Sequence, residues 1–336
     1  MPDLLRALPA PDYRYFELAG DHYACGRQMG QATELRQLDG RPADLAFAAA
    51  CAEAVRAQHA PLIEEYRGYA DAQGRPWSDV LPHFSLNHPA GLAGGCSTLV
   101  WRAENGHVMV ARNYDFAAYQ RARHLIRSAP PAVEPVLGTN AGLIGGRYDG
   151  VNAAGVFVAL HLVRADLPAR VGPGVPFHLV PRILLETCQT ARQALSRLRA
   201  MPLLFPFNYV IADANDFFAV ETYPGAIGVR RGEDVLVTTN HYQHPDLERY
   251  HGGRKADDSR RRAARLLELW AERRGDPLAW SQVVLADHIA PLCHHERALA
   301  TLWALTVDLT ARRLAYCPGP PCQTPFSELP WPSRPA

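Results

Sequence analysis

The sequence lacks a long apolar run and an excess of charge of either sign. No stretch of about 18 apolar residues occurs, so we expect no membrane-spanning helix. Residues 1–20 contain early prolines and no continuous apolar stretch, which argues against a secretory signal. Lysine and arginine total 35 against 34 aspartates and glutamates, so the formal net charge is +1. We therefore expect no nucleic-acid partner and no membrane partner.

Cysteines are few, odd in number and scattered. The seven of them in a chain without a secretory signal indicate reduced thiols and a cytoplasmic protein. Histidine pairs at 241/244 and 294/295 lack the spacing of a zinc-binding helix. Cys317 and Cys322 enclose prolines and have no matching cysteine pair, so we interpret that segment as a loop. We expect no metal and no cofactor.

The order of local patterns along the chain predicts an α+β fold. At 336 residues with 48% apolar and 21% charged content, the chain can bury a sizeable core. Helix-favouring residues dominate from about 21 to 88, and further helical patterns lie near 180–198 and 259–274. No internal repeat or low-complexity block occurs. Short β-like runs follow residue 96, at 99–101, 108–111, 156–162, 209–212, 217–221, 235–239, 302–307 and 314–317.

One segment combines a cysteine, two glycines and a hairpin signal. Cys96 follows Gly94–Gly95 and opens an apolar run that ends at Asn105–Gly106, a strong signal for a β-hairpin turn. A two-residue loop at Asn105–Gly106 would place Cys96 directly opposite Asp115. Opposed residues have Cβ atoms about 4.5–5.5 Å apart, so a thiol and a carboxylate are expected to meet there.

Arg112 adds a positive charge to this hairpin. It lies three residues before Asp115, so its side chain reaches the site only with a bulge or a twist. A lone cysteine at a strand start is more often a small buried hydrophobe. A neighbouring cation lowers a thiol pKa, however, and raises the thiolate fraction that a nucleophile needs. We therefore interpret Cys96 as a candidate nucleophile.

Cys96, Arg112 and Asp115 stand at a spacing that resembles the N-terminal-nucleophile cysteine hydrolases. The chain is most similar to the acyl-coenzyme A:isopenicillin N (6-aminopenicillanic acid) acyltransferase branch, which is related to choloylglycine hydrolases and penicillin V acylases. The resemblance implies a four-layer αββα sandwich with a helical N-terminal prosegment. Five further segments carry it, namely 26–31 before the cysteine, 149–156, 238–241, 259–262 and 293–295.

The resemblance also implies that the chain is a zymogen that cuts itself between Gly95 and Cys96. Residues 1–95 would then be a helical prosegment, and residues 96–336 the catalytic domain. The freed α-amine of Cys96 would act as general base. Its unperturbed pKa of about 7.7–8.0 suits proton transfer near neutral pH.

Other site residues follow from the same resemblance. Asn240 would donate to the oxyanion, and Arg260 would be the site arginine, although Arg261 and Arg262 are equally available. Where relatives have an asparagine after the 150–155 turn this chain has Leu162. The second oxyanion or substrate contact therefore stays open between His161, a backbone N–H near it, and Asn152.

The predicted function is cleavage of a linear, non-peptide amide of an N-acyl substrate through a Cys96 thioester. Hydrolysis and transfer to an amine remain alternatives, so the small-molecule partner is an N-acyl amide or an acyl donor. Retention of the prosegment and a homo-oligomer also stay open. Two other hypotheses are an uncleaved, non-catalytic scaffold and a thiol hydrolase that pairs Cys96 with His161.

Overall fold

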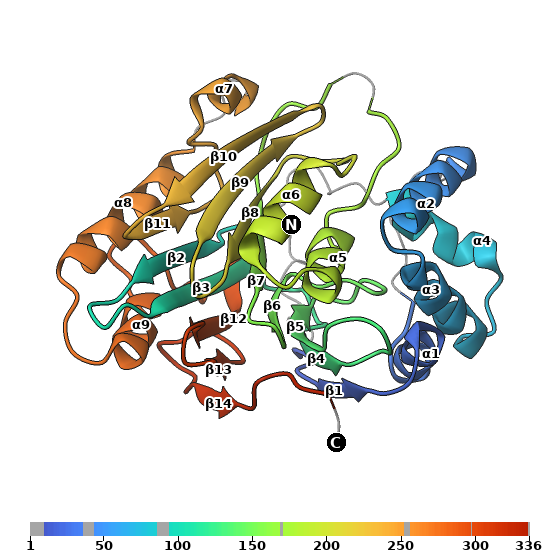
Figure 1. Ribbon diagram of the computed structural model, residues 1–336, viewed down its shortest axis with the longest axis horizontal. Coiled ribbons are helices and arrows are strands. Elements are labelled where there is room, and N and C mark those ends of the chain that lie inside the picture. Colours follow the sequence, from blue (N-terminus) through green and yellow to red (C-terminus); the bar gives the residue numbers. More distant parts are fainter. Residues whose placement is uncertain are drawn as a thin grey trace, which may run out of the picture.

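Two β-sheets pack face to face in the centre of the structure, a computed structural model, and helices cover their outer faces (Figure 1). It describes residues 10–35, 44–85, 94–168, 171–251, 256–296 and 298–334. Within these ranges, no helix has both the length and the apolar character that crossing a bilayer requires. The predicted α+β class is confirmed.

The larger sheet has eight strands in the order β1-β4-β5-β6-β7-β8-β9-β10. Its neighbours pair antiparallel, except for the parallel pair of β1 with β4 at one edge. The strands are β1 (Tyr15–Leu18), β4 (His124–Ser128), β5 (Val136–Asn140), β6 (Asp149–Asn152), β7 (Phe157–Leu162), β8 (Phe207–Ala212), β9 (Phe217–Tyr223) and β10 (Ala226–Gly232).

The smaller sheet has six antiparallel strands in the order β11-β2-β3-β12-β13-β14. They are β2 (Ser97–Arg102), β3 (Val108–Ala117), β11 (Val235–Thr238), β12 (Leu299–Asp308), β13 (Arg313–Cys317) and β14 (Ser327–Leu329). Each of the eight β-like runs of the sequence overlaps a strand. Sequence patterns missed β1, β4, β5, β6, β10 and β14.

Alternation along β2 and β3 divides their side chains between two cores. Val100 and Val110 point toward the larger sheet and join its apolar cluster. Trp101 and Met109 point the other way, toward the helices on the outer face. This period of two is what a strand buried on both faces requires.

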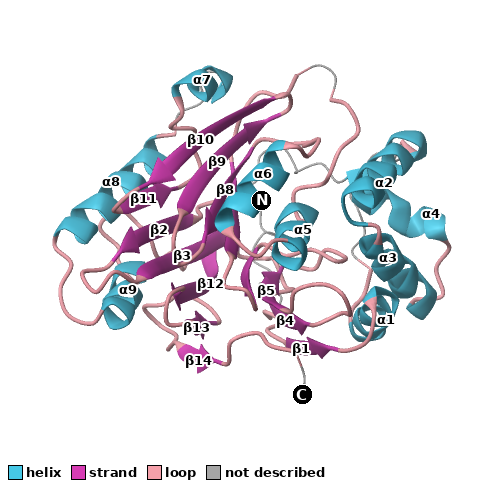
Figure 2. Cartoon of the chain, viewed as in Figure 1, coloured by secondary structure: helices cyan, strands magenta, loops and turns pink. Residues whose placement is uncertain are grey.

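Helices on the outer faces complete the four layers (Figure 2). Helices α5 (Leu179–Thr187) and α6 (Ala191–Arg199) contact the larger sheet, whereas α8 (Asp257–Ala271) and α9 (Pro277–Leu285) contact the smaller one. The chain is therefore layered α-β-β-α, as expected. The single helical stretch expected at 180–198 is split, because Thr190 caps a new helix by accepting from the Gln193 amide at 3.2 Å.

The segment before Cys96 forms helices α1 (His22–Ala32), α2 (Leu45–His59), α3 (Pro61–Ala72) and α4 (Trp77–Val80), a 3-10 turn at Leu81–Ser85, and strand β1. Two glycines let α1 and α3 touch backbone to backbone. A Cβ on Gly26 would lie 1.9 Å from the Glu65 carbonyl oxygen, and one on Gly68 would lie 2.1 Å from that of Tyr23. The segment is therefore not purely helical, because β1 extends the larger sheet.

A buried ionic network joins these helices to α5, and we call it the clasp: His22, His59, Glu65, Arg182 and Glu186. Arg182 donates to Glu186 at 2.6 Å and to Glu65 at 3.0 Å. The other Glu186 oxygen hydrogen-bonds the Nε2 atoms of two histidines, His22 at 2.9 Å and His59 at 2.7 Å. The helices before Cys96 are thus held to the sandwich by charge as well as by apolar packing. Among the described residues, the remaining short helices are α7 (Pro245–Glu248) and a 3-10 turn at Arg249–His251.

Candidate active site

The β2–β3 hairpin has a three-residue loop rather than the expected two. Ala103 and His107 close it by an N–H to carbonyl bond of 2.8 Å, and Gly106 adopts a positive φ of 83°. The observed register pairs Ser97 with Asn113 and Thr98 with Arg112. The predicted pairing of Cys96 with Asp115 is therefore wrong by one residue.

That shift changes which side chains share a face of the sheet. Cys96, Thr98 and Arg112 point into the space between the two sheets. Asp115 and Ser97 point toward the helix layer on the other side. The start of β2 is therefore enclosed from both faces, and the thiol and the carboxylate approach it from opposite sides.

Cys96 is buried at the entrance of β2, and its surroundings keep the thiol protonated. Burial raises the pKa of the Cys96 thiol above its usual value, the Arg112 charge opposes that rise, and Asp115 adds to it. The thiol contacts the Asp115 carbonyl oxygen at 3.8 Å, and the Gly95 amide donates to the same oxygen at 3.2 Å. The cysteine and the residue before it thus rest against the end of β3.

Arg112 bridges the two sheets next to Cys96. Its Nε donates to Asp149 at 2.6 Å, its Nη2 to the Leu160 carbonyl at 2.7 Å, and its Nη1 to Thr98 at 3.1 Å. Asp149 is itself held by the Thr139 hydroxyl at 2.6 Å and by an indole N–H. A fixed, fully buried cation therefore lies on the same face as the thiol.

His161 is tied to Arg112 and not to Cys96. Its Nε2 lies 3.0 Å from Arg112 Nη1 and 2.8 Å from the Thr98 hydroxyl. Because a guanidinium only donates, Nε2 is the unprotonated nitrogen. Burial and the Arg112 charge hold the pKa of His161 well below its usual range, so the ring is neutral. Its Nε2 cannot serve as an oxyanion donor, and it does not hydrogen-bond Cys96 in the part of the chain that is described.

Asp115 lies on the other side of the strand start, with one oxygen hydrogen-bonded and the other facing an imidazole. Its Oδ1 accepts from Thr301 at 2.6 Å, and its Oδ2 lies 3.9 Å from His294 Nε2. Among the described residues, neither Oδ2 nor that Nε2 has a hydrogen-bond partner. Burial raises the pKa of Asp115, while His294 and Thr301 oppose the rise. A bulge in β12 between Thr301 and Trp303 sets this geometry, and bulges often redirect side chains beside active sites.

Asn240 and Arg262 complete the enclosure. Arg262 Nη1 donates to the Gly95 carbonyl at 2.6 Å and to the Cys96 carbonyl at 2.9 Å, and Nη2 donates to Asn240 Oδ1 at 2.9 Å. This contact fixes the orientation of the Asn240 amide, whose Nδ2 donates to the Leu162 carbonyl at 2.8 Å. We call Cys96, Arg112, Asp115, Asn240 and Arg262 the nucleophile cluster.

Arg260, the expected site arginine, lies outside this cluster. Its side chain is exposed on α8, whereas Arg262 is buried. The buried residues of α8 are Ser259, Arg262, Ala263 and Leu266, which are spaced by three or four and form one helix face. That periodicity is the sequence signal that selects Arg262 among the three arginines.

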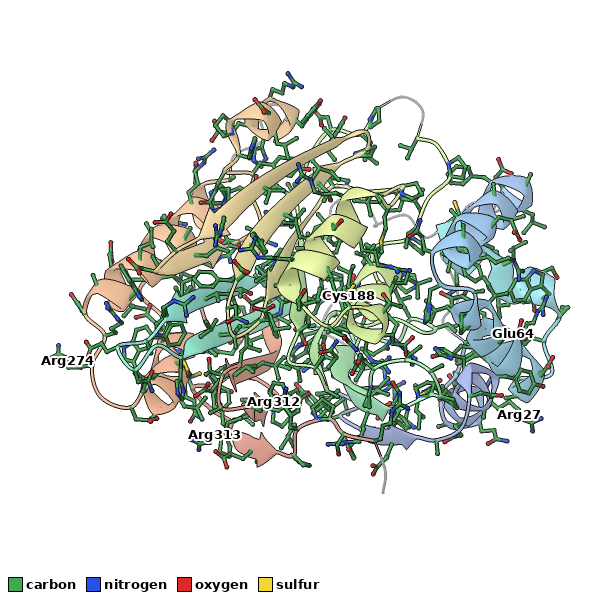
Figure 3. The ribbon with its side chains drawn as sticks, in the orientation of Figure 1. Arg27, Glu64, Cys188, Arg274, Arg312 and Arg313 are labelled. Carbon is green, nitrogen blue, oxygen red and sulfur yellow. The ribbon has the colours of Figure 1, made fainter. Side chains whose placement is uncertain are left out.

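Asn152 is a turn residue rather than a substrate contact. Its Oδ1 accepts from the Gly155 and Val156 amides at 3.0 and 2.8 Å. Its Nδ2 donates to the carbonyls of Leu185 and Cys188 at 2.8 and 2.7 Å, below α5 (Cys188 is labelled in Figure 3). All four hydrogen-bonding positions of the amide are used, so the expected role in the site is wrong.

Sequence reasoning missed several residues that support the cluster: Thr98, Asp149, Thr301 and His294. Asp149 and His294 lay within segments that resemble the family, but no local pattern linked them to Arg112 and Asp115. Thr98 could have been found by alternation, because it lies two residues from Cys96 on the same strand face. Thr301 is 186 residues from its partner Asp115, and only tertiary contact brings it there.

The layers and the position of the candidate nucleophile define the class of protein. Cys96 stands at the start of an interior strand of an αββα sandwich, which is the fold of N-terminal-nucleophile hydrolases. Residues 101–321 match the family described as acyl-coenzyme A:6-aminopenicillanic acid acyl-transferase. The chain belongs to this family.

Three solved structures are similar to parts of the chain at low identity. Penicillin V acylase from Agrobacterium tumefaciens is 18% identical, with a TM-score of 0.44, covering 66% of this chain and 82% of that one. An N-acylethanolamine-hydrolyzing acid amidase ortholog from Caenorhabditis elegans is 16% identical (TM-score 0.48, 64% and 93%). A variant of the conjugated bile acid hydrolase from Clostridium perfringens is 13% identical (0.48, 70% and 92%). No curated protein matches the sequence.

Proposed function

We propose that the protein is an autoprocessed cysteine amidohydrolase or acyltransferase that acts on a linear, non-peptide amide of an N-acyl substrate. The observation that carries this proposal is the setting of the Gly95 carbonyl. Its oxygen accepts a hydrogen bond of 2.6 Å from Arg262 Nη1 and one of 3.4 Å from the Ser97 hydroxyl. The carbonyl before the nucleophile is thus polarised by two donors, as an oxyanion formed there requires.

Processing begins with attack of Cys96 Sγ on the Gly95 carbonyl carbon. The Gly95–Cys96 C–N bond breaks, its nitrogen takes up the thiol proton, and a Gly95 thioester forms. Water then hydrolyses the thioester to a Gly95 carboxylate and restores the thiol. Position 95 favours glycine because the site is crowded, and a Cβ there would lie 3.1 Å from Asp115 Cβ.

The new α-amine of Cys96 supplies the base that the uncut chain lacks. An amide nitrogen has no basic lone pair, whereas an α-amine titrates at about 7.7–8.0. Asp115 Oδ2, which lacks a hydrogen-bond partner among the described residues, is the acceptor that would orient the amine. Arg112 stabilises the thiolate once the amine has taken the proton.

Turnover follows the same geometry with an external amide. The thiolate attacks the substrate carbonyl carbon, and the second N–H of Asn240 Nδ2 donates to the oxyanion. A Cβ on Gly94 would lie 3.8 Å from that Nδ2, so the segment before the cut occupies the position of a substrate. The amine protonates the leaving group, and water or an acceptor amine then takes the acyl group from the thioester.

We also propose that residues 1–95 are the prosegment and residues 96–336 the catalytic domain, and that the prosegment stays docked after cleavage. Strand β1 pairs with β4, and the clasp links three N-terminal helices to α5. Neither contact requires the Gly95–Cys96 bond. Chromatography of the cleaved protein under native conditions should therefore recover both fragments in one peak.

The test is the covalent state of the purified protein. A denaturing gel with intact mass should show fragments of about 10 and 27 kDa from the 37.1 kDa chain, the larger beginning at Cys96. Cys96→Ala should stay one chain, and Cys96→Ser should cleave slowly because a hydroxyl is the weaker nucleophile. Amidase activity in a preparation that keeps the Gly95–Cys96 bond would overturn the proposal.

Substrate preference is then measured on the cleaved protein. The panel contains fatty acyl, phenoxyacetyl and bile-acid amides and acyl-homoserine lactones, each assayed with and without an added amine. Release of free acid indicates hydrolysis, and a new amide indicates acyl transfer. Both products should be absent with Cys96→Ala.

A further inference from the structure

A cluster of sulfur and imidazole ligands lies near the C-terminal end of the fold. His288, Cys293 and His295 belong to the segment between α9 and β12, and Cys322 belongs to the segment between β13 and β14. The ligand atoms of His288, His295 and Cys322 lie within 4.8 Å of one another. Cys293 lies outside this group of three and contacts it through Cys322, since the two Sγ atoms are 3.5 Å apart.

We propose that His288, Cys293, His295 and Cys322 bind one zinc ion. Two thiolates and two imidazoles are a donor set of structural, tetrahedral zinc sites. Zinc–sulfur bonds of about 2.3 Å place two sulfurs about 3.7 Å apart in a tetrahedron, close to the observed separation. The imidazole rings are edge to face, with centroids 5.1 Å apart, so they converge without stacking.

The arrangement of the four residues favours a metal over a disulfide. A disulfide has an S–S bond of about 2.05 Å and uses no histidine. It would leave the two imidazoles beside Cys322 without a role. Cys317, the nearby cysteine in β13, is not a ligand, because its thiol contacts the carbonyls of Gly319 at 3.3 Å and Thr324 at 3.2 Å.

The site would also support Asp115. His294 stands between two of the proposed ligands, and its amide donates to Thr301 Oγ1 at 2.9 Å. The Thr301 amide donates back to the His294 carbonyl at 2.7 Å, and its hydroxyl donates to Asp115 at 2.6 Å. A metal bound by Cys293 and His295 would hold His294 between them and so fix this chain of contacts. Its role is positioning, because it touches no reacting atom.

Metal binding can be tested without activity, on the uncleaved Cys96→Ala protein purified with reductant. Elemental analysis should find about one zinc per chain. Replacement by cobalt should give the intense visible bands of tetrahedral Co²⁺ and a thiolate charge-transfer band. His288→Ala and Cys322→Ser change exposed residues, so both should fold, and each should lower bound zinc at least about tenfold.

His294→Ala is the matched control, since it changes the neighbour of two ligands and should keep the zinc. Zinc at the same low level in the parent and in Cys322→Ser would overturn the proposal. So would a Cys293–Cys322 disulfide, found as a mass 2 Da lower with two fewer titratable thiols. Only the link to Asp115 rests on the proposed function. Zinc binding together with an inactive cleaved protein would refute that function and leave the metal site standing.

Discussion

The nucleophile cluster and the clasp are both built from arginines and carboxylates taken out of water. In the clasp, Arg182 reaches Glu65 and Glu186, and the second Glu186 oxygen meets two histidines. Within the described ranges, none of the buried side-chain nitrogens and oxygens of the clasp lacks a partner. The nucleophile cluster differs, because Asp115 Oδ2 is buried and accepts no hydrogen bond from any residue that the structure describes.

The difference is visible in the acidity of the two carboxyls. Burial by itself would raise the pKa of Glu186, but Arg182, His22 and His59 hold it well below its usual range. The pKa of Asp115 is raised, because its burial outweighs the help of His294 and Thr301. A network in which every buried polar atom has a partner stabilises the folded state. A buried carboxylate oxygen without a hydrogen bond destabilises the folded state, and a hydrogen bond from the amine of Cys96 would remove that cost after cleavage.

Breaking the clasp should give the largest effect on stability. Removing one partner of a buried ion pair costs about 3–5 kcal/mol, so Glu186→Gln in the Cys96→Ala protein should lower the melting midpoint by at least about 5 °C. Thermal unfolding monitored by circular dichroism measures this shift. If the clasp only restrains the helices locally, the midpoint will not move.

The matched control is Glu64→Gln on the exposed side of α3 (labelled in Figure 3). Glu64 pairs with Arg67 at 2.8 Å, and both side chains are about half exposed, at 46% and 51%. An exposed pair contributes about 0–1 kcal/mol, so this variant should melt close to the parent.

Breaking the nucleophile cluster should affect chemistry, and the two arginines of α8 test this directly. Arg262→Ala removes the donor to the Gly95 carbonyl, so self-cleavage should slow by about 100- to 1,000-fold. Arg260→Ala should cleave like the parent, because its side chain is exposed. Rates come from intact mass after synthesis in a cell-free system. Equal rates in the two variants would exclude Arg262 from the reaction.

Asn240→Ala should lower amidase turnover and leave the stability of the fold nearly unchanged. Loss of one oxyanion donor lowers amidase turnover by about 100-fold in comparable sites. The melting midpoint should change little, because Asn240 is only half-buried and its lost contacts are one carbonyl and Arg262. Turnover of the cleaved variant near that of the parent would remove Asn240 from the site.

Asp115→Asn should shift the melting midpoint only slightly, and in the opposite direction to Glu186→Gln, as a gain in stability. The pKa of Asp115 is raised in the folded protein. The free energy of unfolding therefore falls as the pH rises from the unfolded pKa of about 3.9 through the folded pKa. In uncleaved Cys96→Ala, the asparagine should therefore raise the melting midpoint by about 2 °C at pH 7 and by less at pH 4. In the active protein, the same change should stop turnover. A lower midpoint at pH 7 would show that Asp115 is satisfied before cleavage.

Local patterns predicted much of the fold. Short β-like runs found the strands at 99–101 and 302–307, and helix-favouring composition found the helices before residue 85. Short or polar strands such as β6 and β14 escaped, because three or four residues carry too little periodicity. The strand β1 escaped for another reason, since its pairing with β4 depends on a segment more than 100 residues away.

The sequence by itself determined the α+β class, the resemblance to a family, and the candidacy of Cys96, Arg112, Asp115 and Asn240. Tertiary structure decided the rest. One extra loop residue at 104–106 moved Cys96 and Asp115 to opposite faces of the sheet, since side chains alternate with a period of two. Packing of α8 selected Arg262 from three adjacent arginines and brought it to Gly95 across 167 residues. A local pattern carries periodicity, and contacts at such separations form only when the layers pack.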